Sequence, residues 1–212
     1  MIILAIDTST RFLSVAVADG DRALSSYHRE AHMRHSSRLI PTIEACLKRA
    51  RLKLKDVDGF AVSIGPGSFT GLRIGVTTVK ALAFSLKRPV AAVPTLDAIA
   101  EGAKRFKGVI SPVIDAKKRK VYSCFYESDG KRIKRLTKYL LIEPDRLAKM
   151  TERFGNVLRL GDGVDINSRT WQPRASVVAR LAAEKFKKRQ FSNIFDLAPL
   201  YLYSRECDIK GW

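Results

Sequence analysis

The chain has 212 residues, of which 46% are apolar, and its 39 Lys and Arg against 21 Asp and Glu give a net charge of +18. That length is enough for a buried core in one large domain or two small ones, and no apolar run reaches the roughly 18 residues of a membrane span. The first residues reach Asp7 within one strand length and carry no basic region, unlike a secretion signal, so we expect a soluble, cytoplasmic protein.

The first residues predict a meander of three strands. The continuous apolar run at 2–6 suits a strand that is covered on both faces. The alternating run at 13–18 ends at an Asp-Gly-Asp segment, 19–21, which is a hairpin signal, and 23–27 is the returning strand. We therefore expect the chain to open with three sequential strands of one sheet.

A helix is predicted after this meander. Ser36 or Ser37 provides its cap, and Pro41 is compatible only with its first turn. Four apolar residues then fall on one side at the helical period: Leu39, Ile43, Leu47 and Ala50. That side is expected to pack on the sheet.

A glycine-rich segment, 65–71, separates a buried strand at 57–64 from a second helix at 69–86, and a short strand follows at 89–93. The second helix has apolar residues on more than one side. One side carries Leu72, Val76, Val79 and Ala83, and other sides carry Ile74, Ala81 and Leu82. A helix that only covers a sheet needs a single apolar stripe. A second protein or domain is therefore expected on its outer side, with burial inside its own domain as the alternative.

From about residue 104 the same order of elements begins again. The predicted elements are strands at 109–114, 121–126 and 157–160, a hairpin turn at 129–130, a helix at 144–150 and a last helix from Pro173 to 189 with Val177, Leu181 and Phe186 near its buried face. This repetition indicates two similar lobes, residues 1–103 and 104–212, each with a mixed sheet and flanking helices. The last helix and the tail are the segments that would pack back on the first lobe.

The segment Gly65-Pro66-Gly67-Ser68-Phe69-Thr70-Gly71 lies between a strand and a helix start, where free N–H groups can bind an anion. It is not a P-loop, because Leu72 follows Gly71 where a Lys is required. It is not a nucleophile elbow, because Ser68 directly follows Gly67. The remaining interpretation is a glycine turn that packs the helix closely on the strand.

Three stretches together resemble the TsaB (YeaZ) family, the actin-like, non-catalytic subunits of bacterial tRNA threonylcarbamoyladenosine biosynthesis. They are residues 4–10 (LAIDTST), 65–75 (GPGSFTGLRIG) and 113–118 (VIDAKK); His35-Ser36, Leu39, Pro41 and 199–202 (PLYL) also fit the family pattern. Tyr203 departs from that pattern, which often has Arg there. The resemblance implies an α/β, actin-like (ASKHA, ribonuclease H-like) fold of two similar lobes.

The same resemblance implies a scaffold or activator for threonylcarbamoyl transfer to the tRNA adenosine next to the anticodon. It implies a dimer with the catalytic homologue TsaD, a homodimer through much the same surface when the chain is alone, and a small ATPase, TsaE, in the assembly. The implied interface comprises Leu39, Ile43, Glu44, Leu47 and Lys48 on the first helix and Thr70, Arg73, Thr77, Lys80 and Ala81 on the second. No catalytic residue is expected. The residues with structural roles are Asp7, Gly65, Pro66, Gly67, Gly71 and Asp115.

We expect the metal of the assembly to bind in a partner subunit. The catalytic relative holds its metal with two histidines placed after the strand at 89–93, where this chain has none. His28, His32 and His35 have a spacing that suits metal ligands on a helix. A strand end and a helix start separate them, however, so we expect loop or cap roles and no metal site.

A nucleotide is likewise expected in the partners, as ATP or ADP, and not bound tightly by this chain. The turns that begin at Asp7 and Asp115 lack the glycine with which a phosphate loop approaches its ligand. Each Asp is instead expected to organise its own turn by accepting backbone N–H groups.

Two other functions remain open. A glycoprotease-like hydrolase requires a nucleophile, a base and an orienting group within reach of one another, and an autonomous actin-like ATP-binding protein requires the missing phosphate-loop glycines. The positive charge, densest at 117–120, 131–135 and 185–189, either attracts RNA or only keeps the chain soluble. Contact with tRNA is therefore an open expectation.

Overall fold

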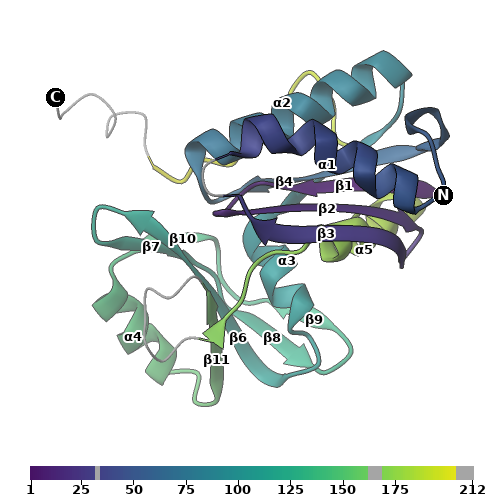
Figure 1. Ribbon diagram of the computed structural model, residues 1–212. Helices are drawn as coiled ribbons and strands as arrows, with labels where there is room; N and C mark the ends of the chain where they lie inside the picture. The colour runs from purple at the N-terminus through teal and green to yellow at the C-terminus, as the bar shows by residue number, and fades with distance from the viewer. Residues whose placement is uncertain (32–33, 162–168, 204–212) are drawn as a thin grey trace, which may run out of the picture. The chain divides into compact units, whose positions relative to one another are not determined.

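The computed structural model describes residues 1–31, 34–161 and 169–203, and these form two compact units (Figure 1). Unit 1 contains Met1–Ala98 and Gln172–Pro199, and unit 2 contains Ile99–Trp171 and the tail from Leu200. The first boundary lies inside helix α3 (Thr95–Gly102) instead of at residue 103, because Ala98 belongs to the core of unit 1.

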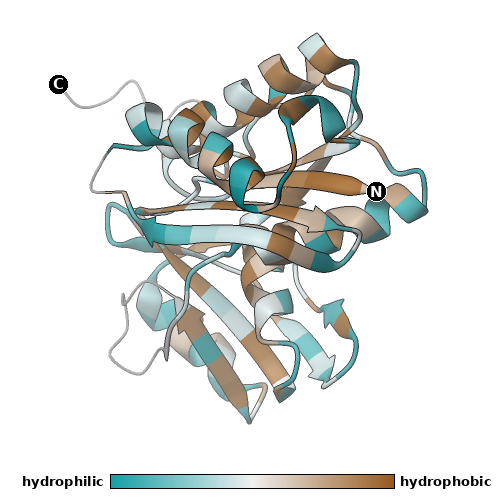
Figure 2. Cartoon of the chain, turned by 45° about the vertical axis from the view of Figure 1, so that its right-hand side comes forward, coloured by the Kyte–Doolittle hydropathy of each residue, from teal (hydrophilic) through white to brown (hydrophobic). Residues whose placement is uncertain are grey.

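Unit 1 is built on a five-stranded mixed sheet in the order β3-β2-β1-β4-β5. Its strands are β1 (Ile2–Asp7), β2 (Phe12–Asp19), β3 (Arg22–Glu30), β4 (Gly59–Gly65) and β5 (Val90–Pro94). The first three form the predicted antiparallel meander, while β4 runs parallel to β1 and β5 parallel to β4. β1 is central and buried, and Figure 2 shows it as hydrophobic along most of its length.

Helices cover both faces of this sheet. The helices α1 (His35–Arg49) and α2 (Phe69–Leu86) pack on one face and α5 (Ala175–Lys187) on the other, with a short 3-10 helix at Leu54–Asp56. Alternate residues of a strand point to opposite faces. Ile6 and Val62 therefore contact the core under α1 and α2, while Ala5 and Ala61 face α5.

The start of α1 differs from the prediction. The helix begins at His35 with Arg34 as its N-cap, and no side-chain hydrogen bond caps it, so neither Ser36 nor Ser37 has the expected role. Pro41 lies in the second turn instead of the first. It is tolerated there on the exposed side of the helix, where water can satisfy the carbonyl that lacks its N–H partner.

The start and the buried face of α5 also differ from the prediction. The helix begins at Ala175 instead of Pro173, because Arg174 has an extended backbone (φ −114°, ψ 132°) and is the N-cap. The backbone N–H of Ala175, the first helical residue, donates to Ser14 Oγ (3.0 Å). Its buried side chains are Ala175, Val178, Ala179, Ala182, Ala183 and Phe186. Val177 and Leu181 are only partly buried, so the true face is rotated from the predicted one.

Unit 2 has a seven-stranded mixed sheet in the order β10-β7-β6-β11-β12, with β8 paired to β6 and to β9. Its elements are β6 (Lys107–Lys117), β7 (Lys120–Ser123), β8 (Tyr126–Asp129), β9 (Ile133–Arg135), β10 (Leu140–Ile142), α4 (Pro144–Glu152), β11 (Val157–Gly161) and β12 (Arg169–Thr170). Its core joins the sheet to α4 and contains Val113, Val121, Phe125, Ile142 and Leu147.

The predicted strand at 121–126 is two strands, β7 and β8. The chain leaves the sheet between them, and the backbone N–H of Phe125 donates to Thr137 Oγ1 (3.1 Å) instead of to a neighbouring strand. The short strands β9, β10 and β12 and the helix α3 have no counterpart among the predicted elements.

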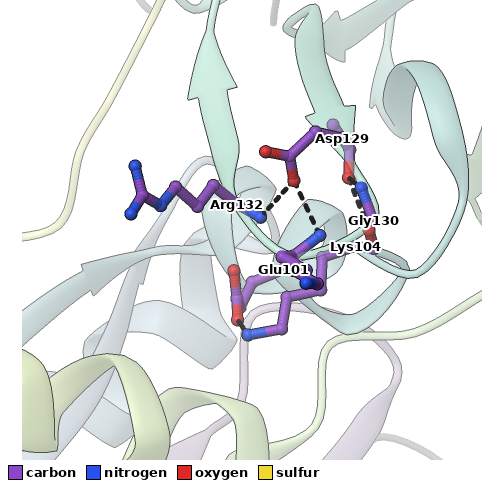
Figure 3. A network of polar contacts seen from close by, with 7 residues as sticks. Glu101, Lys104, Asp129, Gly130 and Arg132 are labelled. Atoms are coloured by element: carbon purple, nitrogen blue, oxygen red, sulfur yellow. Dashed lines mark hydrogen bonds and ion pairs between the residues drawn. The ribbon is translucent and has the colours of Figure 1, made fainter.

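The hairpin between β8 and β9 closes at the predicted turn (Figure 3). One carboxylate oxygen of Asp129 accepts the backbone N–H groups of Lys131 (2.7 Å) and Arg132 (2.6 Å). Beside it, Lys104 forms an ion pair with Glu101 of α3 (2.6 Å).

Within the described ranges, no helix combines the length and the apolarity needed to cross a membrane.

Candidate functional site

The glycine segment after β4 packs directly on the turn between β1 and β2. The backbone N–H of Ser68 donates to the carbonyl of Ser9 (2.7 Å), and Thr8 Oγ1 donates to the carbonyl of Gly71 (2.7 Å). A Cβ atom at Gly67 would lie 2.2 Å from the Ser9 carbonyl oxygen, and one at Gly71 would lie 2.0 Å from that of Thr8. Only glycine fits at both positions, so this segment holds the start of α2 against the turn.

Gly65 and Pro66 complete the bend that precedes α2. Gly65 has a φ of +109°, which favours glycine, and the peptide bond to Pro66 is cis. Ser68 then caps the helix, because its Oγ accepts the backbone N–H of Gly71 (3.2 Å). The Ser68 hydroxyl therefore has a local structural role at the start of α2.

Asp7 ends β1 and is fully buried. Its Oδ1 accepts the backbone N–H of Ser9 (3.1 Å), and the Ser9 hydroxyl donates to the two carboxylate oxygens (3.0 and 3.1 Å). Burial raises the pKa of Asp7 to about 6, although the hydrogen bonds from Ser9 act to lower it. This carboxylate holds the backbone of the turn that the glycine segment covers.

Asp115 has the corresponding position in unit 2, near the end of β6. Its Oδ1 accepts the backbone N–H of Lys117 (2.7 Å), and its other oxygen pairs with Lys117 Nζ. Partial burial acts to raise the pKa of Asp115, but the hydrogen bonds and the charge of Lys117 outweigh it and hold the pKa below its usual value. Both aspartates thus accept the N–H group two residues further along the chain.

Two of the three histidines contact the same aromatic residue. His28 stacks on Phe12 with ring centroids 4.9 Å apart, and His35 is buried with Nε2 3.3 Å from the carbonyl oxygen of Phe12. His32 lies outside the described residues. No group of three His, Cys, Asp or Glu side chains is placed to hold a metal ion in the part of the chain that the structure describes.

The interface residues expected on α1 and α2 divide into a buried and an exposed set. Leu39, Ile43 and Leu47 are only 1%, 3% and 5% exposed, so they are not available to a partner, contrary to the expectation. The reason is that α1 uses its single apolar stripe to pack on its own sheet. The exposed set comprises Glu44, Lys48, Thr70, Arg73, Thr77 and Ala81.

Lys80 of α2 is partly buried, because it fixes a distant segment of unit 1. Its Nζ donates to the backbone carbonyls of Phe195 (3.3 Å) and Leu197 (3.2 Å), which follow α5 in the chain. Leu197 and Ile194 also join the core under α1 and α2. The segment after α5 therefore lies along α2, beside its exposed set.

Exposed aromatic side chains that were not predicted lie on α2 and on this segment. Phe84 and Phe195 are 67% and 75% exposed, and their rings meet edge to face with centroids 6.4 Å apart. Phe69 is 49% exposed, and the guanidinium of Arg73 lies 3.8 Å from its ring centre. The helical period carried the signal for Phe84, which continues the line of Arg73, Thr77 and Ala81. Phe195 had no such signal, because only tertiary packing brings it to α2.

The chain is similar over most of its length to proteins of one family. Residues 27–193 match the family model described as TsaD, tRNA N6-adenosine threonylcarbamoyltransferase. The chain is 31% identical to the tRNA threonylcarbamoyladenosine biosynthesis protein TsaB of Bacillus subtilis, covering 99% of this chain and 97% of that protein. It is 32% identical to the TsaB protein of Buchnera aphidicola subsp. Schizaphis graminum, covering 96% and 93%. The solved structure of YeaZ from Pseudomonas aeruginosa has a TM-score of 0.82 at 29% identity, covering 95% of this chain and 99% of that one. This chain, with its actin-like fold, therefore belongs to the TsaB (YeaZ) family of tRNA threonylcarbamoyladenosine biosynthesis proteins.

Proposed function

We propose that this chain is a non-catalytic subunit in the formation of threonylcarbamoyladenosine on tRNA. It acts by pairing with a TsaD-like catalytic homologue through the outer face of α1 and α2. The observation that carries the proposal is the exposed pair of Phe84 and Phe195 beside the exposed set on α2. The names of the relatives, tRNA threonylcarbamoyladenosine biosynthesis proteins, support the reaction in which the pair takes part.

The chemistry of this face suits a protein partner. Contiguous exposed apolar groups are uncommon on a monomer and mark interaction sites, and aromatic and Arg side chains carry much of the binding energy at interfaces. Phe84 and Phe195 already contact each other, and Arg73 already stacks on Phe69, so their conformations are partly ordered before a partner binds. Glu44 and Lys48 on α1 are exposed and suit the charged rim of such an interface.

The same face also serves a homodimer when the chain is alone. Because one patch can bind only one partner at a time, a second copy of the chain and the catalytic homologue compete for it. A TsaE-like ATPase completes the assembly in the cytoplasm, and the metal and the ATP or ADP bind in the partner subunits.

The local roles of two conspicuous groups support a non-catalytic subunit. The Ser68 hydroxyl caps α2, which opposes its use as a nucleophile in a glycoprotease-like hydrolase. The β1–β2 turn is bonded to the glycine segment through Thr8 and Ser9, which opposes its use as an independent phosphate loop. Asp7 remains with a structural role at that turn.

The decisive experiment places a charge on the aromatic pair. We expect Phe84→Asp to raise the Kd for the catalytic homologue by about 30-fold or more, because an aromatic hot spot contributes at least about 2 kcal/mol. Leu24→Asp is the matched control, since Leu24 is an exposed apolar residue (38%) on β3 of the same unit. Sedimentation equilibrium measures pairing, and circular dichroism checks that both variants are folded. A folded Phe84→Asp variant that pairs like the control would refute the proposed interface.

Two assays on the isolated chain test the other functions. Peptide hydrolysis that disappears in Ser68→Ala, in a variant that still folds, would establish the hydrolase. Tight ATP binding with magnesium, measured by calorimetry, would establish the autonomous nucleotide site. The proposed function predicts neither signal.

A further inference from the structure

We propose that the tip of the hairpin between β6 and β7, residues Lys117–Lys120, contacts the phosphate backbone of an RNA (Figure 1). The identification of that RNA as a tRNA rests on the proposed function, whereas the contact itself follows from the geometry and charge of the tip. This tip is distinct from the aromatic face on α1 and α2, because it belongs to unit 2.

The backbone of this tip is costly for the residues that occupy it. Lys117, Lys118 and Arg119 all have positive φ values, 62°, 50° and 56°. Lys118 and Arg119 form a two-residue turn between the paired residues Lys117 and Lys120, a geometry in which hairpins favour Asn-Gly. Three consecutive side chains with a Cβ in the left-handed region therefore reduce stability. Such a cost is typical of places where function requires particular residues.

Neighbouring groups hold this turn in place. The Tyr203 hydroxyl lies 3.1 Å from the carbonyl oxygen of Ala116 and 3.3 Å from that of Lys117. Its ring meets Tyr122 of β7 edge to face, with centroids 6.2 Å apart, and Lys118 Nζ lies 5.9 Å from its centre. Asp115 also accepts the Lys117 N–H, so the basic side chains extend from a supported backbone.

The tip has an excess of positive charge that the described acidic residues do not neutralise. Residues 115–120 contain four cations and one acid, which is a surplus of three positive charges. Lys117 pairs with Asp115, and among the described residues no acid lies within ion-pairing distance of Lys118, Arg119 or Lys120. Lys118 and Arg119 are exposed. A surplus of positive charge on a supported turn attracts a polyanion.

The residue types favour a phosphate backbone over an acidic protein. Lys is depleted at protein–protein interfaces, whose centres are aromatic and apolar. Lys and Arg side chains, by contrast, make most of the contacts that position a protein on nucleic acid phosphates. A run of Lys-Lys-Arg-Lys presents this second chemistry, and its affinity for RNA will depend steeply on salt.

A double substitution separates the charge of the tip from its shape. Lys118→Asn with Arg119→Gly installs the favoured turn sequence and removes two cations, so the fold is retained or stabilised. The matched control is Arg51→Gly with Arg189→Gly, which removes two exposed arginines of unit 1 that also have positive φ, 58° and 54°. The full chain is titrated with an unmodified tRNA transcript over a range of salt concentrations. Its pairing with the catalytic homologue is measured in parallel.

We expect the tip variant to bind the transcript on the order of tenfold more weakly and to lower the salt slope by about two, as for the loss of two phosphate contacts. The control is expected to change the affinity less than twofold, and the tip variant to unfold at or above the wild-type temperature. Unchanged RNA affinity, or an equal loss in the control, overturns the inference. Polyglutamate, titrated in the same way, represents an acidic protein. If the tip variant loses binding to polyglutamate but not to tRNA, the inference is overturned in favour of an acidic protein. We expect the tip variant to pair with the catalytic homologue as the wild type does. Failure of the proposed interface and failure of the RNA contact are therefore separate results.

Discussion

The two turns that begin with an aspartate follow the same local pattern in opposite environments. Asp7 in unit 1 and Asp115 in unit 2 each accept the backbone N–H two residues on. Asp7 is fully buried, and burial raises its pKa to about 6. The Asp115 side chain is 34% exposed and pairs with Lys117, and its pKa is lowered. The same acid at the same place in a turn therefore has its pKa shifted in opposite directions.

The segment that covers the turn causes this difference. In unit 1, Gly67 and Gly71 allow α2 to approach the backbone of Thr8 and Ser9 and exclude water from Asp7. In unit 2 the turn is left as an exposed basic tip. A turn motif thus determines local hydrogen bonds, while a neighbouring segment determines whether the turn serves packing or presents charge.

The contact that buries the first turn is the most sensitive test of this comparison. Gly71→Ala places a Cβ 2.0 Å from the Thr8 carbonyl, a backbone atom that cannot move aside easily. We expect a loss of about 3 kcal/mol or more in the free energy of unfolding, measured by denaturant titration. Helix propensity alone predicts the opposite sign, a gain of about 1 kcal/mol. The control is Gly20→Asn, because nothing lies within 4 Å of its Cβ position and Asn tolerates the positive φ. A stable Gly71→Ala variant would contradict the close packing of α2 on the turn.

The pKa of Asp7 predicts how stability changes with pH. Its folded value of about 6 is above the ordinary 3.8, so between these values the folded state keeps a proton that the unfolded state has lost. Stability from this group is therefore present at low pH and declines as the pH rises from about 4 to about 6, by roughly 3 kcal/mol. Asp7→Asn is neutral throughout and lacks this decline. Denaturant titrations of both proteins between pH 4 and 7 measure the difference, and parallel pH profiles would exclude a raised pKa.

Asp115 should give the opposite and smaller pH dependence. Its lowered pKa means that the folded state loses its proton more readily than the unfolded state. This group therefore stabilises the protein at neutral pH, and the contribution is lost as the pH falls through the lowered folded value. Because the carboxylate is about one-third exposed, we expect Asp115→Asn to cost less than about 1 kcal/mol at pH 7. If the difference in the free energy of unfolding between Asp115→Asn and the wild type grew as the pH fell, the pKa of Asp115 would be shifted in the opposite direction.

The smallest expected effect concerns the support of the exposed turn. Tyr203→Phe removes the hydroxyl near the carbonyls of Ala116 and Lys117 but keeps the ring that meets Tyr122. We expect about 0.5 kcal/mol of lost stability and faster hydrogen exchange of the amides at 117–120. Tyr27→Phe in unit 1 serves as the control for loss of a tyrosine hydroxyl. Unchanged exchange at the tip would mean that Tyr203 does not hold this turn.

The secondary structure of unit 1 was largely predictable, because strong periodic patterns and glycine signals mark its elements. The predicted second helix, 69–86, coincides with α2, and the meander at the start is confirmed. The short strands β9, β10 and β12 were missed, since two or three residues carry no periodic signal and pair only when a neighbouring strand is in place. The prediction that Ser36 or Ser37 caps α1 was wrong, because the helix already begins at His35 and Arg34 is its N-cap.

For the candidate site, the sequence by itself determined the family and the kind of local chemistry. The eleven residues 65–75 and the absence of histidine at 93–99 follow from the residues alone, as do the turn-forming roles of Asp7 and Asp115. Only the tertiary structure decided which residues are exposed. Leu39, Ile43 and Leu47 are buried, and Phe195 contacts Phe84. The turn at Asp7 is buried, whereas the turn at Asp115 is not. The reason is that periodicity reports which residues share a side of an element. Burial depends on segments far away in the chain, such as the one after α5 that lies along α2.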